Sequence, residues 1–146
     1  MNDLSRAREC ARTMYDADRA SRELGITIDV TTPGHATAVM PVTGSMLNGH
    51  DVCHGGYLFT LADTAFAFAC NGYNDVTVAA AASIDFLRPA KDGDRLTATA
   101  SERHRQGRTG IYDVEITNQR GERVALFRGK SFATGEPMLR AGRGAP

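Results

Sequence analysis

Asp63 is the residue whose surroundings most suggest chemistry. It is the only charged residue in the otherwise apolar run from His54 to Cys70. An ionised carboxylate is rarely buried without partners, because desolvating the charge is costly. A carboxylate held in such a run can act as a nucleophile or a general base. Asp63 can also be explained without chemistry, as a side chain at a water-filled rim or as a cap on a neighbouring loop.

A pair of glycines, Gly55-Gly56, follows His54 at the start of the same run. Small residues at the start of a helix expose backbone N–H groups beside the positive end of the helix dipole. Such donors stabilise a carbonyl oxygen that becomes negative during acyl transfer, and loss of one donor typically costs about 3 to 4 kcal/mol. Because Gly-Gly pairs also occur in simple tight turns, it is the combination with Asp63 that favours acyl transfer.

Gly55 and Asp63 are too far apart on one helix to act on one carbonyl group. They are separated by eight positions, or about 12 Å at a rise of ~1.5 Å per residue. We therefore predict a two-fold dimer in which Gly55 of one chain and Asp63 of the other share a substrate.

The elements that must position these residues follow from the pattern of apolar residues. The run from His54 to Cys70 lacks proline and period-two alternation, which predicts a helix that ends at a left-handed cap, Asn71-Gly72. Apolar residues on every side of this helix indicate that the rest of the chain encloses it. The predicted strands are Ile26–Thr32, His35–Thr43, Val76–Leu87, Arg95–His104, Ile111–Asn118 and Glu122–Thr134. This order predicts an α+β fold with an antiparallel sheet around a central helix.

The length of 146 residues fits a single domain, residues 1–146. Within residues 1–24, apolar residues at helical spacing predict an amphipathic helix from Asp3 to Glu23, and Gly25 is a stop signal. Residues 135–146 show no apolar period and are predicted to form a flexible tail.

The charge balance and the cysteines bound the class of protein. Basic and acidic residues number 17 each, so we expect no nucleic-acid or membrane partner. No secretory signal is visible at the N-terminus, and no apolar run is long enough to span a bilayer. The odd number of cysteines, Cys10, Cys53 and Cys70, argues against a disulfide framework and favours the cytoplasm.

The run MLNGHDVCHGGYLFTLADTAFAFACN, with SIDFLRPA and LFRGKSF after it, resembles the hotdog-fold acyl-CoA thioesterases of phenylacetic acid degradation. The likeness extends from the first helix to about Phe132. It implies a hotdog fold, dimers that pair into tetramers, and hydrolysis of aryl-acetyl-CoA or related thioesters to free acid and CoA. It also implies that no metal or other cofactor takes part, since CoA belongs to the substrate.

The resemblance also implies roles for individual residues. Asp63 would be the nucleophile or general base, and the Gly55 amide would polarise the carbonyl. Asn48 and His54 would hold the thioester or the water, and Thr64 would support the carboxylate. Each of the last three also has a structural explanation: a turn at Asn48, a backbone contact at His54, and a bond from Thr64 to its own helix.

Contacts to the rest of the substrate are less specific. Gly56 is a second candidate donor at the helix start. CoA carries several phosphates, so a neutral protein needs a local group of cations to bind it. The candidates are Arg88, Lys91, Arg128 and Lys130, although such residues are more often ordinary solvated charges.

Other readings of the sequence are open. His50, Asp51, Cys53 and His54 include three good zinc ligands, but the spacing matches no common zinc motif. A serine hydrolase or nucleotide-binding enzyme is disfavoured, because neither G-x-S-x-G nor a P-loop occurs. An acyl-CoA hydratase or dehydratase and a non-catalytic acyl-CoA-binding protein are the remaining alternatives, since a fold alone does not decide function.

Overall fold

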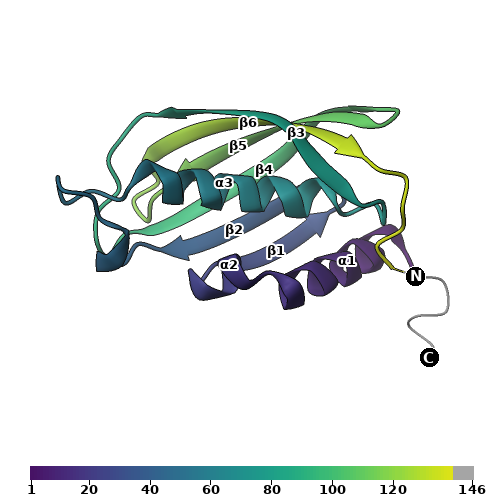
Figure 1. Ribbon diagram of the computed structural model, residues 1–146, viewed down its shortest axis with the longest axis horizontal. Helices are drawn as coiled ribbons and strands as arrows, with labels where there is room; N and C mark the ends of the chain where they lie inside the picture. The colour runs from purple at the N-terminus through teal and green to yellow at the C-terminus, as the bar shows by residue number, and fades with distance from the viewer. Residues whose placement is uncertain (140–146) are drawn as a thin grey trace.

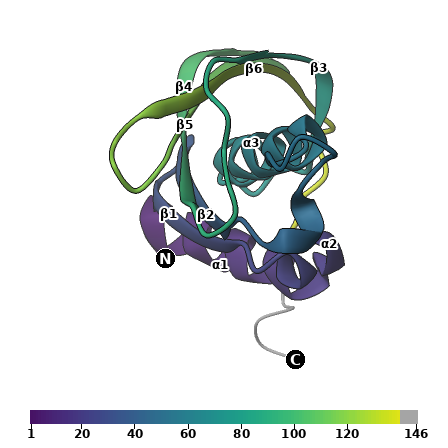
Figure 2. The ribbon, with the colours of Figure 1, turned by 90° about the vertical axis from the view of Figure 1, so that its left-hand side faces the viewer.

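The computed structural model describes residues 1–139, in which a six-stranded antiparallel sheet curls around one long helix (Figures 1 and 2). The helix is α3, Gly55–Cys70. The strands are β1 (Thr27–Thr32), β2 (His35–Pro41), β3 (Thr77–Phe86), β4 (Arg95–Gln106), β5 (Thr109–Thr117) and β6 (Arg123–Ala133), in the sheet order β1-β2-β4-β5-β6-β3. This confirms the predicted α+β hotdog fold, and each predicted strand lies within a few residues of an observed one.

Small side chains allow α3 to lie close to the centre of the sheet. Strands β2 and β4 pair in register and turn buried alanines toward the helix, among them Ala36, Ala38, Ala98 and Ala100. The helix itself is predominantly apolar and contains no proline, so it forms without interruption. Close packing of this kind removes apolar surface from water at about 25 cal/mol per Å².

Aromatic side chains join α3 to strands β5 and β6. The Phe66 ring lies 5.6 Å from the Tyr112 ring and 5.9 Å from the Phe127 ring, measured between centroids. Gly129 is opposite Phe66, and a Cβ there would come within 2.8 Å of the ring. A side chain at position 129 would therefore displace the helix from the sheet.

One stripe of α3 is not enclosed, which differs from the prediction that the helix is covered on every side. Gly56 is exposed, and Thr60, Asp63 and Ala67 are only partly buried. These residues are spaced as i, i+4, i+7 and i+11, so they share one helix face. Beyond it lies β3, an edge strand exposed over most of its length.

The N-terminal segment forms two helices where the sequence predicts one. Helix α1 covers Asp3–Ala17 and α2 covers Arg19–Glu23. The break occurs at Asp18, whose carboxylate accepts hydrogen bonds from the Ser21 amide at 2.9 Å and its hydroxyl at 2.6 Å and so caps α2. Both helices lie against the β1 side of the sheet (Figure 2). None of the helices within residues 1–139 combines the length and hydropathy needed to span a bilayer.

The end of α3 differs from the predicted left-handed cap. Asn71 has a φ of −92° and is a buried C-cap, whereas the left-handed residue in this turn is Asn74, with a φ of 57°. The Asn71 side chain donates to the carbonyl groups of Ala67 and Thr77 and accepts from the Thr77 amide. The turn is therefore fixed by side-chain bonds to the start of β3, which a local pattern does not reveal.

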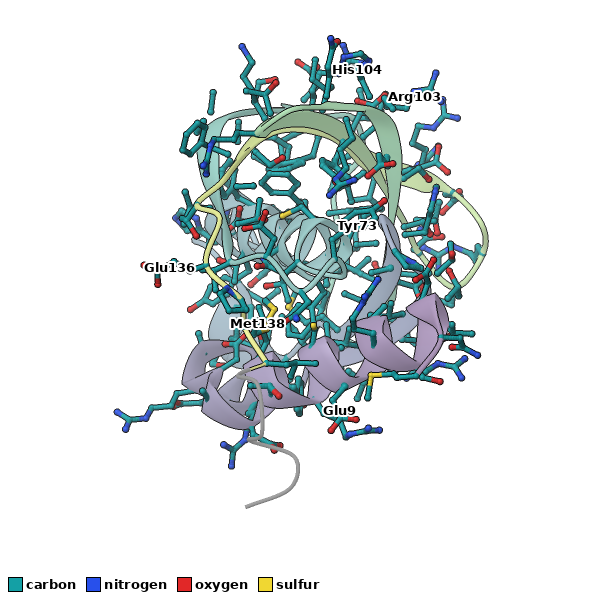
Figure 3. All side chains as sticks on the ribbon, turned by 90° about the vertical axis from the view of Figure 1, so that its right-hand side faces the viewer. Glu9, Tyr73, Arg103, His104, Glu136 and Met138 are labelled. Atoms are coloured by element: carbon teal, nitrogen blue, oxygen red, sulfur yellow. The ribbon has the colours of Figure 1, made fainter. Side chains whose placement is uncertain are left out.

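The segment of residues 135–139, part of the predicted flexible tail, is hydrogen-bonded to the turn before β3. The Gly135 amide donates to Asp75 at 2.8 Å, and the Leu139 amide donates to Asn74 at 2.7 Å. Figure 3 shows this end of the molecule, where Tyr73 lies beside the helix while Arg103 and His104 lie at the periphery. Residues 140–146 lie outside the described part of the chain.

Candidate active site

The first turn of α3 presents one backbone donor without an acceptor. His54 is the N-cap, and its Nδ1 accepts a hydrogen bond of 3.4 Å from the Gly56 amide. The amide of Gly55 has no acceptor anywhere in residues 1–139. Because the first amides of a helix have no partner within it, Gly55 is the available donor for an oxyanion, and Gly56 is occupied by the cap.

The backbone before α3 is held by two distant segments. The Cys53 amide donates to the Ala90 carbonyl at 2.7 Å, and the His54 amide donates to the Met46 carbonyl at 2.8 Å. Ala90 ends the SIDFLRPA motif, so this motif fixes the start of the helix that carries the glycines.

Asn48 stabilises the loop that leads to the helix. Its side-chain oxygen accepts from the His50 amide at 2.9 Å and from the Val52 amide at 3.4 Å. This is a side-chain turn of the kind that asparagine favours. The structural explanation of Asn48 is therefore supported, while its side-chain NH₂ group has no acceptor within residues 1–139.

Asp63 lies half-buried on the open stripe of α3. It is one turn beyond Phe59, whose ring contacts that of Phe127 on β6 at 5.4 Å between centroids, so Asp63 lies on the side of the helix nearest the β6–β3 edge. Its carboxylate has no hydrogen-bond or ion-pair partner within residues 1–139. Burial raises the pKa of the Asp63 carboxyl above its ordinary value, because desolvation disfavours the charged form.

Thr64 does not contact the Asp63 carboxylate in the single chain. Its hydroxyl donates to the Thr60 carbonyl at 2.7 Å, one turn earlier in the helix. Thr60 bonds the Gly56 carbonyl in the same manner at 3.0 Å. Back-bonding of this kind is the ordinary behaviour of a helical threonine.

The candidate CoA contacts fall into two separate groups. Arg88 and Lys91 line a surface hollow of about 340 Å³ with Pro89, Arg120 and Glu122. Ala90, whose carbonyl accepts from the Cys53 amide, lies in the chain between the lining residues Pro89 and Lys91, so this hollow is close in space to the start of α3. Arg120, which the sequence reasoning did not single out, comes from the β5–β6 turn. Glu122 pairs with Arg88 at 3.5 Å and with Arg120 at 3.0 Å, and Arg120 also lies 3.8 Å from Asp94. Lys91 has no ion-pair partner within residues 1–139, so the three lining cations still outnumber the one lining carboxylate.

Arg128 and Lys130 lie on the outer face of β6, away from α3. Their neighbours Phe127, Gly129 and Ser131 are buried on the inner face, and side chains alternate between faces along a strand. Arg128 makes a bidentate pair with Asp113, at 2.7 and 2.9 Å. The Arg128 bond holds the pKa of the Asp113 carboxyl below its ordinary value. The structure therefore does not bring these two cations together with Asp63 or Gly55.

The site of one chain is open rather than concave. The two larger grooves have volumes of about 490 and 410 Å³; one lies on the outer face of the sheet and one between α1 and β1, and neither is lined by Asp63 or Gly55. No group of three or more His, Cys, Asp or Glu side chains within residues 1–139 is arranged to hold a metal.

Sequence reasoning also missed Phe86, the last residue of β3. Its ring lies directly against Gly55, although it is 55% exposed. The motif SIDFLRPA contains this residue, but a period-two pattern identifies only the face of a strand and not the helix residue that it contacts.

Comparison with known proteins agrees with this geometry. The family model of the thioesterase superfamily matches residues 50–125. The acyl-coenzyme A thioesterase PaaI of Escherichia coli is 55% identical over 125 residues, which cover 86% of this chain and 89% of that protein. The structure of the E. coli PaaI protein from the phenylacetic acid degradation operon matches with a TM-score of 0.91 at 51% identity, covering 93% of this chain and 99% of that one.

A Streptococcus mutans protein solved with bound acetyl-CoA matches with a TM-score of 0.73 at 29% identity, over 77% of this chain and 90% of that one. The matched family segment contains both the start of α3 and Asp63. The fold, moreover, agrees with that of a thioesterase over nearly the whole chain. This protein therefore belongs to the thioesterase superfamily.

Proposed function

We propose that this acyl-CoA thioesterase hydrolyses aryl-acetyl-CoA, such as phenylacetyl-CoA or its ring-hydroxylated forms, in aromatic acid catabolism. The reaction class follows from the family and from the identity to an acyl-coenzyme A thioesterase. The aryl-acetyl group is supported by the likeness to the PaaI protein of the phenylacetic acid degradation operon. The observation that carries the site is the half-buried Asp63 carboxylate on the helix that begins with the Gly55 amide, because neither group has a hydrogen-bond partner within residues 1–139.

The chemistry requires a donor for the carbonyl oxygen and a carboxylate for the attack. The Gly55 amide binds the thioester oxygen and stabilises the negative charge that develops on it. Ionised Asp63 either removes a proton from water as the water oxygen bonds to the carbonyl carbon, or attacks that carbon itself. When the C–S bond then breaks, the thiolate of CoA leaves and takes up a proton. The water route releases the free acid in this step, whereas the direct route leaves the acyl group on Asp63 until a water molecule cleaves the anhydride. No metal or other cofactor is needed.

The two routes differ in the fate of the Asp63 oxygen atoms. Direct attack gives a mixed anhydride on Asp63, and when ¹⁸O-water hydrolyses it at the aspartyl carbonyl the label enters the carboxylate during a single turnover, so label in Asp63 identifies this route. The general-base route leaves the Asp63 carboxylate unlabelled. Mass spectrometry of the peptide that contains Asp63 distinguishes them.

We further propose that the catalytic site is shared between two chains of a homodimer, and that dimers pair into tetramers. On one helix, Gly55 and Asp63 are separated by about 12 Å, and neither of the two larger grooves within residues 1–139 is lined by Asp63. Strand β3 is an unpaired edge with a run of exposed alanines, Ala79 to Ala82. Pairing of this edge with the same strand of a second copy would extend the sheet and bring the open stripe of each α3 close to the start of the other.

The remaining substrate contacts are assigned on the same basis. The hollow lined by Arg88, Lys91 and Arg120 is the better candidate for the CoA phosphates, because these cations outnumber the carboxylates there. Arg128 is neutralised by Asp113 on the outer face, which disfavours its assignment. His54 is proposed to hold the thioester or the water.

Asn48 and Thr64 are also proposed to take part in the site. For Asn48, the side-chain NH₂ group would be the group that holds the thioester or the water. For Thr64, support of the carboxylate would require its hydroxyl to donate to Asp63 instead of to the Thr60 carbonyl, to which it donates in the single chain. The three cysteines are free and buried, which fits a reducing compartment. We propose that the protein is located in the cytoplasm, where CoA metabolism also takes place.

An assay of free thiol release tests the proposal against its alternatives. Phenylacetyl-CoA, hydroxyphenylacetyl-CoA, benzoyl-CoA and fatty acyl-CoA esters are each incubated with the protein and a thiol reagent. We expect the highest kcat/KM with the aryl-acetyl esters. A fatty acyl ester that is clearly preferred would contradict the aryl-acetyl assignment. A hydratase would release no thiol from these esters, and a binding protein would retain them without turnover.

A further inference from the structure

Phe86 is positioned by β3 so that its ring contacts the first residue of α3. It is the last residue of that strand and pairs with Ala125 of β6. Helix α3 and strand β3 run in opposite directions, so the end of β3 returns to the end of the molecule where α3 begins (Figure 1). A Cβ atom built on Gly55 would lie 3.0 Å from Cζ of the Phe86 ring and 3.3 Å from Cε1.

This contact explains why residue 55 is glycine. Gly55 does not have a positive φ, so its backbone conformation is open to any residue. A side chain at position 55 would instead lack space, because a separation of 3.0 Å between carbon atoms is shorter than van der Waals contact. At Gly56, by comparison, a Cβ would meet His54 Nδ1 at an ordinary 3.7 Å.

The Phe86 ring is also exposed, with 55% of the residue accessible. A large apolar side chain at the surface is usual when isolated, but here it lies beside the Gly55 amide, which has no acceptor within residues 1–139. An apolar wall next to a few well-placed polar groups is the ordinary composition of a ligand site. The ring is therefore in the position to contact whatever is attached to a carbonyl bound by the Gly55 amide.

We propose that Phe86 is a specificity-determining residue, which selects for acyl groups that are unbranched at the carbon next to the carbonyl. This inference rests on the proposed thioesterase site at Gly55. The α-carbon of the acyl group is two bonds from the oxygen that Gly55 binds, so it lies near the ring. A CH₂ group, as in an aryl-acetyl ester, packs against the flat ring, whereas an α-methyl branch collides with it. Phe86 thus favours aryl-acetyl over α-branched acyl groups.

The kinetic test compares phenylacetyl-CoA with 2-phenylpropanoyl-CoA, which differs by one α-methyl group. We expect the protein to prefer phenylacetyl-CoA by about tenfold or more in kcat/KM, and Phe86→Ala to reduce this ratio to about threefold or less. Phe132→Ala is the matched control, because Phe132 is 43% exposed on the outer face of β6; it should leave the ratio unchanged.

Two results would overturn the proposal. An equal loss of kcat/KM for both esters in Phe86→Ala would show that the ring only supports the helix start. A change of oligomeric state in that variant, measured by light scattering, would make the ring an interface residue. If the protein hydrolyses no aryl-acetyl-CoA, the aryl-acetyl assignment fails separately, and the ratio is measured with the best acyl-CoA substrate and its α-methyl derivative.

A stability measurement tests the contact without any substrate. Gly55→Ala should lower Tm when Phe86 is present, because the new methyl group meets the ring. In the Phe86→Ala background, the same change should leave Tm unchanged or raise it, since alanine is the better helix residue. Coupling of this sign identifies a direct contact. Equal effects of Gly55→Ala in both backgrounds would mean that the ring does not lie on Gly55 in solution, and the proposal would fail.

Discussion

The two edges of the sheet are built in different ways. At one edge, β1 is a six-residue strand, TIDVTT, and α1 lies against it (Figure 1). The Tyr15 hydroxyl donates to the Ile26 carbonyl at 2.7 Å, and the Arg8 guanidinium donates to the Val30 carbonyl at 3.4 Å. At the other edge, β3 has ten residues, TVAAAASIDF, and most of them are exposed.

Each edge strand contains one bulged residue, Thr31 in β1 and Ala80 in β3, so the strands differ in chemistry more than in geometry. Polar side chains and a covering helix are the usual means of preventing an edge from pairing with another chain. They are present at β1. At β3, close to Asp63 and Gly55, polar side chains are fewer and the middle of the strand is a run of exposed alanines, Ala79 to Ala82. The chain therefore protects the edge far from the candidate site better than the near one.

The largest expected effect is the loss of the carboxylate beside the open edge. Asp63→Asn should lower kcat by at least about 10³-fold while folding and CoA binding persist, because the amide is isosteric but is neither a nucleophile nor a base. Asp29→Asn is the matched control, since Asp29 is an exposed carboxylate on β1. Steady-state kinetics of the two variants check this. A loss of less than about tenfold in Asp63→Asn would exclude the catalytic role.

A lysine introduced at each edge of the sheet should weaken the dimer and lower activity only at β3, and by less than Asp63→Asn. In Ala80→Lys, two like charges would approach across a two-fold axis, so we expect dissociation and a loss of activity on the order of tenfold or more at low protein concentration. Higher concentration should partly restore both. Thr31→Lys introduces the same charge at the bulge of β1 and should leave the molecular mass of the assembly and its activity unaltered. Sedimentation together with kinetics provides the measurement, and an active, monomeric Ala80→Lys would refute a site completed across this edge.

Mixing two inactive variants tests whether the open edge joins two half-sites. Asp63→Ala lacks the carboxylate, and Gly55→Pro lacks the backbone donor. After joint unfolding and refolding in equal amounts, about half of the dimers are mixed, and each has one intact site, so activity should approach about a quarter of that of the unaltered protein. Mass spectrometry verifies that mixed dimers form. If they form without any recovery, the carboxylate and the donor belong to the same chain.

The smallest expected effect is on stability as a function of pH. Burial raises the pKa of Asp63 in the folded state above its ordinary value of 3.8. Below that value the carboxyl is protonated in both the folded and the unfolded protein, so it does not lower the free energy of unfolding. As the pH rises through the folded pKa, the desolvated charge removes stability. Asp63→Asn should therefore raise Tm by a few degrees at pH 7 and by nothing below the ordinary pKa. A lower Tm at pH 7 would indicate a structural role for Asp63.

Local patterns predicted the elements well because each element is governed by its own side chains. In β5, buried residues such as Tyr112 and Val114 alternate with partly buried polar residues such as Asp113, and a half-buried antiparallel strand requires that alternation. Patterns failed where a distant or competing bond decided the outcome. Asp18 ends α1 by capping α2, and the bonds from Asn71 to Thr77 replace the predicted left-handed cap.

Some residues of the candidate site could be predicted from the sequence and others could not, for the same reason. The residue types around Asp63 and Gly55 were recognisable because a charge in an apolar helix and small residues at its start are unusual whatever surrounds them. The cations could not be sorted by sequence. Arg88 and Arg128 have the same chemistry, and only the strand pairing turns Arg128 outward to Asp113 while Arg88 lines a hollow near the helix start.

By itself the sequence determined the fold class, the succession of helix and strands along the chain, and the apolar helix that contains Asp63, because side-chain periodicity is a local property. Helix rise adds the prediction, still to be tested, that a second chain completes the site. Only the tertiary structure decided which face of α3 stays open, which edge of the sheet is available, and that the ring of Phe86 occupies the space beside Gly55. These depend on contacts between residues far apart in the chain, and such contacts are set by the packing of the whole sheet around the helix rather than by any segment of it.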